Sequence, residues 1–290
     1  MTTAAARLVC DEPTARRLAS YLAETLDGED CVCAAFEGAD GRWQVAVHFR
    51  QPPDEATLRA LVAVVAGEEA AAALTIEPVD DADWVAQSLA GLKPVRAGRF
   101  VVHGAHDRVS LKPNDIAIEI EAALAFGTGH HGTTRGCLLA LDDLAKRQHP
   151  RSVLDIGTGS GVLAIAAAKR LRRHVVASDI DRVAVDAARG NARLNRAAAS
   201  IVFTCAAGTR ARAIATRGPY DLIFANILLG PLIRLAVPIR AVTARRGRIV
   251  LSGLLSSHAN AALAAYRAQG LMLERRFTID GWVTLVLRRG

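Results

Sequence analysis

The 290-residue sequence predicts an α/β protein built on a mostly parallel sheet, preceded by a small α+β domain. The first observation is a buried strand followed by a glycine-rich turn and an apolar helix, within residues 152–173. The second is a regular alternation of strands and helices behind that turn, which closes with two strands around a short turn. The third is a change of composition, since an acidic front part of the chain joins a basic back part.

Residues 1–78 predict the element order β-α-β-β-α-β, which is that of a ferredoxin-like, split-βαβ sandwich. Strands are expected over 5–10, 31–36, 43–49 and 74–77, and helices over 14–26 and 54–66. Pro13 in a first turn, Asp54 as a cap and Gly67 near a helix end support the helix bounds. Residues 79–92 predict a linker, and a second domain is expected over 93–290.

The second domain begins with two short strands, over 100–103 and 116–120, and a helix over 135–147. Further strands are expected over 152–156, 174–178, 200–205, 221–225 and 248–252, with helices behind the glycine turn and over 182–194, 231–242 and 257–269. The strands over 271–278 and 282–287 flank a short turn at 279–281 and form a hairpin. Five parallel strands and this hairpin predict a seven-stranded Rossmann-like sheet, unlike the six-stranded dinucleotide-binding fold.

The glycine turn is the first candidate site. Gly157, Gly159 and Gly161 stand at two-residue spacing between a strand and a helix, where unpaired backbone N–H groups and the positive end of the helix dipole meet. A dinucleotide fingerprint would need G-x-G-x-x-G, but Val162 follows the third glycine. Asp179 ends the following strand, near the spacing at which a carboxylate binds ribose hydroxyls. The alternative is a tight strand-to-helix turn without a ligand.

Two further polar positions belong to the same prediction. Thr134 ends the loop AFGTGHHGTT, where it could cap the following helix or hold a ligand carboxylate. His130 and His131 in that loop have no third metal ligand at a suitable spacing, so no metal is expected. Asn226 stands at the carboxyl end of a strand, where open α/β sheets bind ligands, although it could instead cap the next helix.

Composition limits the possible functions. The aromatic content of 4% argues against a base-stacking platform for single-stranded nucleic acid. No uncharged apolar run is long enough to span a membrane, and five scattered cysteines favour reduced thiols in the cytoplasm. Residues 1–92 carry six Arg and no Lys against sixteen acidic residues, and residues 93–290 carry thirty Lys and Arg against thirteen. This asymmetry indicates either two modules with different partners or ordinary solubilising surface.

Three passages together resemble the PrmA-type enzymes, which methylate the large-subunit ribosomal protein numbered eleven. They are AFGTGHHGTT, VLDIGTGSGVLAIAAAKR with ASDID behind it, and ANILLGP. The likeness extends back to DWVAQSLAGLKP, so it covers roughly residues 80–290. The family loop usually reads G-T-G-T-H-P-T-T, so His130 and Gly132 depart from it and the roles of these positions stay open.

The resemblance implies S-adenosyl-L-methionine (AdoMet) as the cofactor and a ribosomal protein as the substrate, methylated on lysine side chains and the α-amino group. It assigns cofactor contacts to Thr134, Gly157, Gly159, Asp179 and Asn226, with Asn226 at the methyl-transfer end as the catalytic residue. The domain over 1–78 would hold the ribosomal protein.

The resemblance also leads us to expect a cytoplasmic monomer that needs no nucleic acid and no membrane. RNA methylation, which the basic back half favours, is the first alternative. A non-catalytic, AdoMet-binding module on the ribosome is the second, and a NAD-dependent dehydrogenase is a third.

Overall fold

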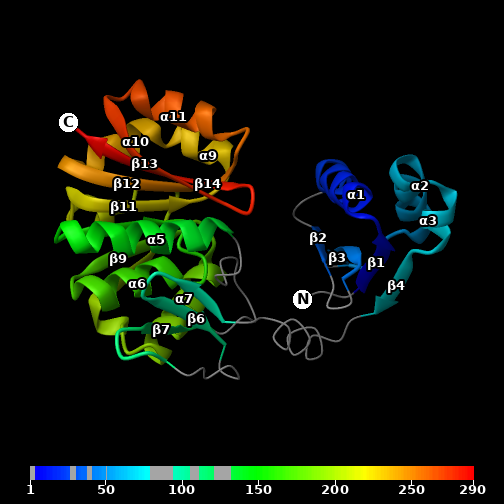
Figure 1. Cartoon of the computed structure of the whole chain (residues 1–290), viewed down its shortest axis with the longest axis horizontal. Helices are drawn as coiled ribbons and strands as arrows, with labels where there is room; N and C mark the ends of the chain where they lie inside the picture. Colours follow the sequence, from blue (N-terminus) through cyan, green and yellow to red (C-terminus); the bar gives the residue numbers. More distant parts are fainter. Residues whose placement is uncertain are drawn as a thin grey trace. The chain divides into compact units, whose positions relative to one another are not determined.

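The computed structural model describes residues 4–26, 31–37, 41–49, 51–78, 94–104, 111–120 and 132–290. The chain divides into two compact units, Met1–Ala90 and Gly91–Gly290 (Figure 1). The linker expected over 79–92 lies outside the described residues.

The first unit is a four-stranded antiparallel sheet with helices packed on it. Its elements are β1 (Ala4–Cys10), α1 (Glu12–Thr25), β2 (Cys31–Glu37), β3 (Trp43–Phe49), α2 (Glu55–Ala66), α3 (Glu68–Ala72) and β4 (Thr75–Pro78). The strand order β2-β3-β1-β4 and the element order are those of a split-βαβ sandwich with one additional short helix, α3. Asp11 caps α1, because its side chain accepts a hydrogen bond of 2.9 Å from the Thr14 amide.

The second unit contains the seven-stranded sheet that the sequence predicts, in the order β10-β9-β8-β11-β12-β14-β13. The strands are β8 (Val153–Ile156), β9 (Val175–Asp179), β10 (Ile201–Cys205), β11 (Tyr220–Asn226), β12 (Thr243–Leu255), β13 (Leu271–Ile279) and β14 (Trp282–Arg289). The first five are parallel, and the β13–β14 hairpin joins β12 antiparallel. The chain leaves β8 for β9 on one side and later returns to β11 on the other, so the topological switch point lies between β8 and β11.

Helices cover both faces of this sheet (Figure 1). They are α5 (Gly132–Arg147), α6 (Val162–Leu171), α7 (Arg182–Leu194), α8 (Arg212–Ala215), α9 (Leu229–Arg234), α10 (Ala236–Val242) and α11 (Ala259–Arg267), with a 3-10 turn at Ala198–Ser200. Alternate strand residues point to opposite faces, so Val153 packs into the core under α5 and α6, and Leu154 into the core under α9 to α11. A separate three-stranded sheet, β5 (Val95–Ala97), β6 (Phe100–His103) and β7 (Ile116–Glu119), precedes α5.

Three sequence expectations differ from the structure. The helix expected over 231–242 is two helices that meet at Leu235, since Pro238 has no N–H to donate and a single helix would need that bond. Strand β12 is longer than expected at both ends, because Thr243 pairs with Tyr220 of β11 and Leu254 and Leu255 pair with β14. The short elements α3 and β5 were not expected, and neither is long enough to show a periodic pattern in the sequence.

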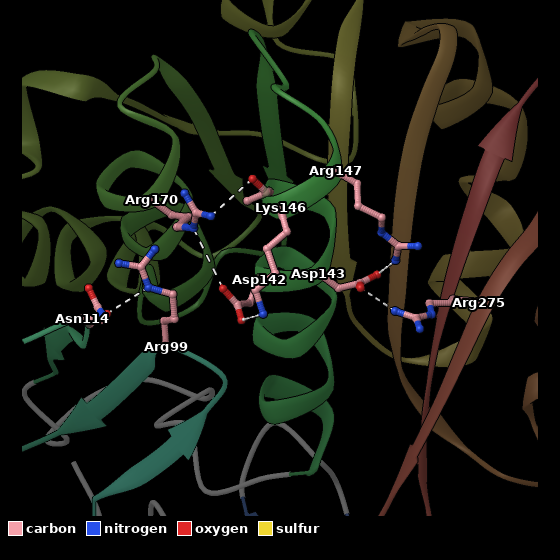
Figure 2. A network of polar contacts seen from close by, with 9 residues as sticks. Arg99, Asn114, Asp142, Asp143, Lys146, Arg147, Arg170 and Arg275 are labelled. Atoms are coloured by element: carbon pink, nitrogen blue, oxygen red, sulfur yellow. Dashed lines mark hydrogen bonds and ion pairs between the residues drawn. The ribbon is translucent and has the colours of Figure 1, made fainter. Parts of the chain in front are cut away.

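Ion pairs fasten α5 to its neighbours (Figure 2). Asp142 is 3% exposed, pairs with Lys146 at 2.8 Å and lies 4.0 Å from Arg170 on α6. Asp143 pairs with Arg147 and with Arg275 on β13. Helix α5 is therefore held between α6 and the terminal hairpin, which fixes the position of its first turn.

Within the described residues, no helix is both long and apolar enough to cross a membrane. The same residues contain no group of three or more His, Cys, Asp or Glu side chains arranged to hold a metal ion. His130 and His131 lie outside them.

Candidate functional site

The glycine turn between β8 and α6 has a backbone that only glycine adopts readily. Gly157, Gly159 and Gly161 have φ values of +70°, +52° and +84°. The amides of Gly157 and Thr158 both donate to the carbonyl oxygen of Ser178, at 2.8 and 3.0 Å, which ties the turn to β9. No side chain caps the start of α6. The turn thus brings exposed backbone and a free helix N-terminus to the carboxyl edge of the sheet.

Asp179 lies directly beside this turn. Its Oδ2 accepts a hydrogen bond of 2.9 Å from the Gly159 amide, and its Oδ1 accepts one of 3.1 Å from the Asp181 amide. A carboxylate has about four acceptor positions, so two remain for a ligand. The structure therefore brings together Gly159 and Asp179, as the spacing predicts, and it adds that the carboxylate also holds the turn.

Asn226 ends β11 on the other side of the switch point. The neighbouring pair Ala225 and Ile156 is in register, so the next residues, Asn226 and Gly157, leave the sheet side by side. The side chain of Ile227 fills the space over Gly157, because a Cβ on that glycine would lie 2.3 Å from the Ile227 Cγ2 atom. Helix α9 begins at Leu229 with Leu228 as its N-cap, so Asn226 does not cap it. The capping alternative is wrong, and Asn226 stands at the position that favours ligand contact.

Thr134 lies in the first turn of α5 and does not cap the helix, since α5 begins at Gly132 rather than at Arg135. Thr134 is 0% exposed, and its Oγ1 has no hydrogen-bond partner among the described residues. The hydroxyl of Ser252 lies 3.2 Å from the carbonyl oxygen of Thr133, and Ser252 pairs with Asn226 across β11 and β12. The first turn of α5 is thus placed at the carboxyl end of the same strands.

Asp155 is a further candidate site residue, which the sequence motifs did not indicate. It lies in β8, two positions before Gly157, and is 1% exposed. Its Oδ2 accepts a hydrogen bond of 2.6 Å from the Thr158 hydroxyl, and its Oδ1 has no partner among the described residues. Burial, together with the nearby negative charge of Asp179, raises the pKa of Asp155 to about 7. The signal in the sequence is an acidic residue inside an otherwise apolar strand that leads into the glycine turn.

These groups suit a ligand with hydroxyls at one end and polar or charged atoms at the other. The carboxylate of Asp179 offers acceptors for neighbouring hydroxyls. The Thr134 hydroxyl and the free oxygen of Asp155 are buried polar atoms, and such atoms are costly unless something pairs with them. The glycine turn allows the ligand to approach the backbone between these two ends.

Comparison with known proteins gives a consistent result. The family model described as "Ribosomal protein L11 methyltransferase (PrmA)" matches residues 19–290. A ribosomal protein L11 methyltransferase of Rhodopseudomonas palustris (strain BisB5) is 51% identical over 288 residues, covering 99% of this chain and 98% of its own. One of Bradyrhizobium diazoefficiens is 52% identical and covers 96% of this chain and 94% of its own.

A solved structure agrees with these sequence matches. The ribosomal protein L11 methylase of Lactobacillus delbrueckii subsp. bulgaricus is 26% identical and superimposes with a TM-score of 0.62, over 69% of this chain and 100% of its own.

Proposed function

The chain belongs to the ribosomal protein L11 methyltransferase (PrmA) family, and from this membership we propose that it methylates ribosomal protein L11 with AdoMet as the methyl donor. It is an AdoMet-dependent methyltransferase with the Rossmann-like sheet of that class. The observation that carries the proposal is the carboxyl edge of the sheet. There the Asp179 carboxylate accepts a hydrogen bond of 2.9 Å from the Gly159 amide, and Asn226 follows the end of the neighbouring strand pair beside Gly157.

The residues at this edge fit AdoMet. The free acceptor positions of Asp179 suit the two ribose hydroxyls. Thr134 and Asp155 each present a buried oxygen that has no hydrogen-bond partner in the part of the chain that the structure describes, and both oxygens suit the polar methionine end. When bound, AdoMet supplies a methyl group already activated on a sulfonium. The protein therefore mainly has to position the acceptor.

We propose lysine side chains and the N-terminal amine of the substrate as the acceptors. A lysine amine has an ordinary pKa of about 10.4, so it must lose a proton before it can attack. Asn226 has no side-chain hydrogen bond within the described residues, so its carbonyl oxygen is free to accept a hydrogen from the amine. That contact would direct the nitrogen lone pair toward the methyl group, and we assign to Asn226 this catalytic role.

The first unit is proposed to hold the substrate protein. Residues 1–92 carry a large excess of acidic over basic residues, which complements a basic client. We also propose that the chain acts as a monomer. Because the substrate is a ribosomal protein, we expect the enzyme to act in the cytoplasm.

The test is methylation of purified ribosomal protein L11 by the full chain with methyl-labelled AdoMet. Peptide mass spectrometry should place the label on lysine side chains and on the N-terminal amine. The matched reaction contains ribosomal RNA in place of the protein. Label that enters the RNA and not the protein would favour the RNA methyltransferase alternative, and AdoMet binding without any label transfer would favour the non-catalytic module.

A further inference from the structure

The edge of the sheet opposite the glycine turn carries a row of arginines. Parallel strands all begin at the same edge, so residues that precede them come together there. Seven arginines stand at the beginnings of β9, β8, β11 and β12 and at the end of the antiparallel β14, and we call them the arginine edge: Arg172, Arg173, Arg151, Arg217, Arg245, Arg246 and Arg289. These five strands are neighbours about 4.8 Å apart, so the row is about 19 Å long.

The charges of the arginine edge are not neutralised by carboxylates. Six of the seven side chains are exposed and Arg289 is half-buried. None of the seven forms an ion pair with any residue that the structure describes. Asp221 is the acidic residue that contacts the backbone of Arg151, and its carboxylate accepts the amides of Arg151 and Ser152, at 2.8 and 3.2 Å, rather than a guanidinium of the row. Glu274 pairs with Arg248, at 3.1 Å, which is not part of the arginine edge.

Two of these arginines occupy backbone positions that favour glycine. Arg172 ends α6 with φ +52°, and Arg246 has φ +60° in the turn at the start of β12. The backbone alone would therefore favour glycine at both places, so glycine can replace either arginine without backbone strain.

A hollow of about 450 Å³ opens at the same edge, within the size range of small-molecule sites. It lies where α10 ends and β12 begins, and its lining includes Pro219, Val242, Ala244, Arg245 and Arg289. The Arg289 guanidinium is held in place by the carbonyl oxygens of Arg240, at 3.3 Å, and Thr243. Most residues that line the hollow are apolar, and Arg245 and Arg289 lie among them.

We propose that the arginine edge binds the phosphate backbone of RNA. An arginine guanidinium can donate two parallel hydrogen bonds to the oxygens of one phosphate. The arginines of this row come from five neighbouring strands, and none forms an ion pair with a described residue. A row of about 19 Å is long enough to meet several successive phosphates of one strand. An acidic protein is the weaker alternative, because its carboxylates would not repeat at that regular spacing. The chain has few aromatic residues for base stacking, so the contact reads the backbone rather than the sequence.

The geometry also separates this surface from catalysis. The arginine edge lies at the strand beginnings, and Gly157 and Asn226 lie at the strand ends. Bound RNA is therefore held while a protein amine occupies the methyl-transfer edge, and RNA is not the methyl acceptor. RNA binding at this edge is distinct from the proposed methylation, and it is measured without any methyl transfer.

The test is fluorescence anisotropy of the full chain with a labelled RNA hairpin of about 20 nucleotides, titrated at several salt concentrations. The variant Arg172→Gly/Arg246→Gly removes two charges and gives both backbones the residue they favour, so it should fold and bind AdoMet normally. Its RNA dissociation constant should rise about tenfold at physiological salt. The slope of log K against log salt should become shallower by about 1.4 to 1.8, at 0.7 to 0.9 per lost phosphate contact.

The matched control is Arg234→Ala/Arg276→Ala, which removes two exposed arginines of α9 and β13 outside the arginine edge. It should bind RNA like the unchanged chain. Equal weakening in both double variants, or an unchanged salt slope in Arg172→Gly/Arg246→Gly, would overturn the proposal. Competition by poly-L-glutamate as effective as that by unlabelled hairpin would also overturn it, because the edge would then recognise acidic protein as well as RNA.

Discussion

Asp179 has two tasks in the structure, and they shape the effect of replacing it. Its carboxylate holds the Gly159 amide at 2.9 Å and the Asp181 amide at 3.1 Å, and its remaining acceptor positions suit the ribose hydroxyls. We expect Asp179→Ala to weaken AdoMet binding by about one to two decades, since charge-assisted hydrogen bonds are worth about 1.5–3 kcal/mol. Asp179→Asn keeps an acceptor for the Gly159 amide and should lose less. Isothermal titration calorimetry measures both, and unchanged affinity in the alanine variant would refute the assignment.

Asn226 does not cap α9, because the N-cap position of that helix is Leu228 and no side chain caps it. Asn226→Ala should therefore leave the melting temperature nearly unchanged. If Asn226 positions the amine in the transition state, kcat should fall about 10²- to 10³-fold while KM for the protein substrate moves little. Single-turnover methylation at saturating AdoMet gives this rate. A near-normal rate would show that Asn226 is not a catalytic residue.

Asp155 should make stability depend on pH. Its pKa in the folded chain is about 7, above the ordinary value of 3.8, because burial disfavours the charged form. The folded state then holds a proton that the unfolded state releases, so this stabilisation is present below about pH 4 and is lost as pH rises to about 7. The free energy of unfolding should fall by at most about 1.4 kcal/mol per pH unit in this range. The urea midpoint should change less between pH 5 and pH 7 in Asp155→Asn than in the unchanged chain. An equal change in both proteins would show that the pKa of Asp155 is not raised by its burial.

The strand-to-helix turn is the element on which the site depends. Gly157→Ala forces an L side chain into φ +70°, at a cost of about 1–2 kcal/mol, and places its Cβ 2.3 Å from the Ile227 Cγ2 atom. We expect lower stability and weaker AdoMet binding together. The matched control is Gly190→Ala in the interior of α7, where a Cβ meets nothing within 4 Å. The free energy of unfolding of that control, measured by urea denaturation, should rise by about 0.5–1 kcal/mol. A similar loss of stability in both variants would argue against a special role for the turn.

Helix α5 delivers Thr134 to the site through contacts far from it. Asp142 and Asp143 lie in the second half of α5, where they form ion pairs with side chains of α6 and β13. The first turn of α5 contacts β12, because the Ser252 hydroxyl lies 3.2 Å from the Thr133 carbonyl oxygen. The first turn of the helix therefore carries the buried Thr134 hydroxyl to the carboxyl edge of the sheet. This arrangement explains how a residue before the sheet in sequence comes to stand at its carboxyl edge.

At the scale of the whole molecule, the two units should separate cofactor binding from substrate binding. All the described candidate residues lie in the second unit, Gly91–Gly290. A chain truncated to that unit should bind AdoMet with the affinity of the full chain. It should lose most of its methylation of ribosomal protein L11, because the binding energy of the first unit no longer positions the amine. Truncated chain that methylates as fast as the full chain would contradict a docking role for residues 1–78.

The sequence by itself determined the class of fold and the centre of the site. Periodic apolar patterns and capping residues are local, so most strands and helices could be placed within a few residues. The glycine spacing before α6 and the acidic residue at the end of β9 also lie close in sequence, and the structure joins them through the Gly159–Asp179 hydrogen bond. The terminal hairpin could be read in the same local way.

The tertiary structure decided what local patterns leave open. Only the start of α9 at Leu229 excludes the capping role of Asn226, and only burial beneath the turn gives Asp155 its raised pKa. The arginine edge is the clearest case, since Arg151 and Arg289 are far apart in sequence. They come together because parallel strands begin at one edge of the sheet while an antiparallel strand ends there, which depends on strand order and not on local sequence.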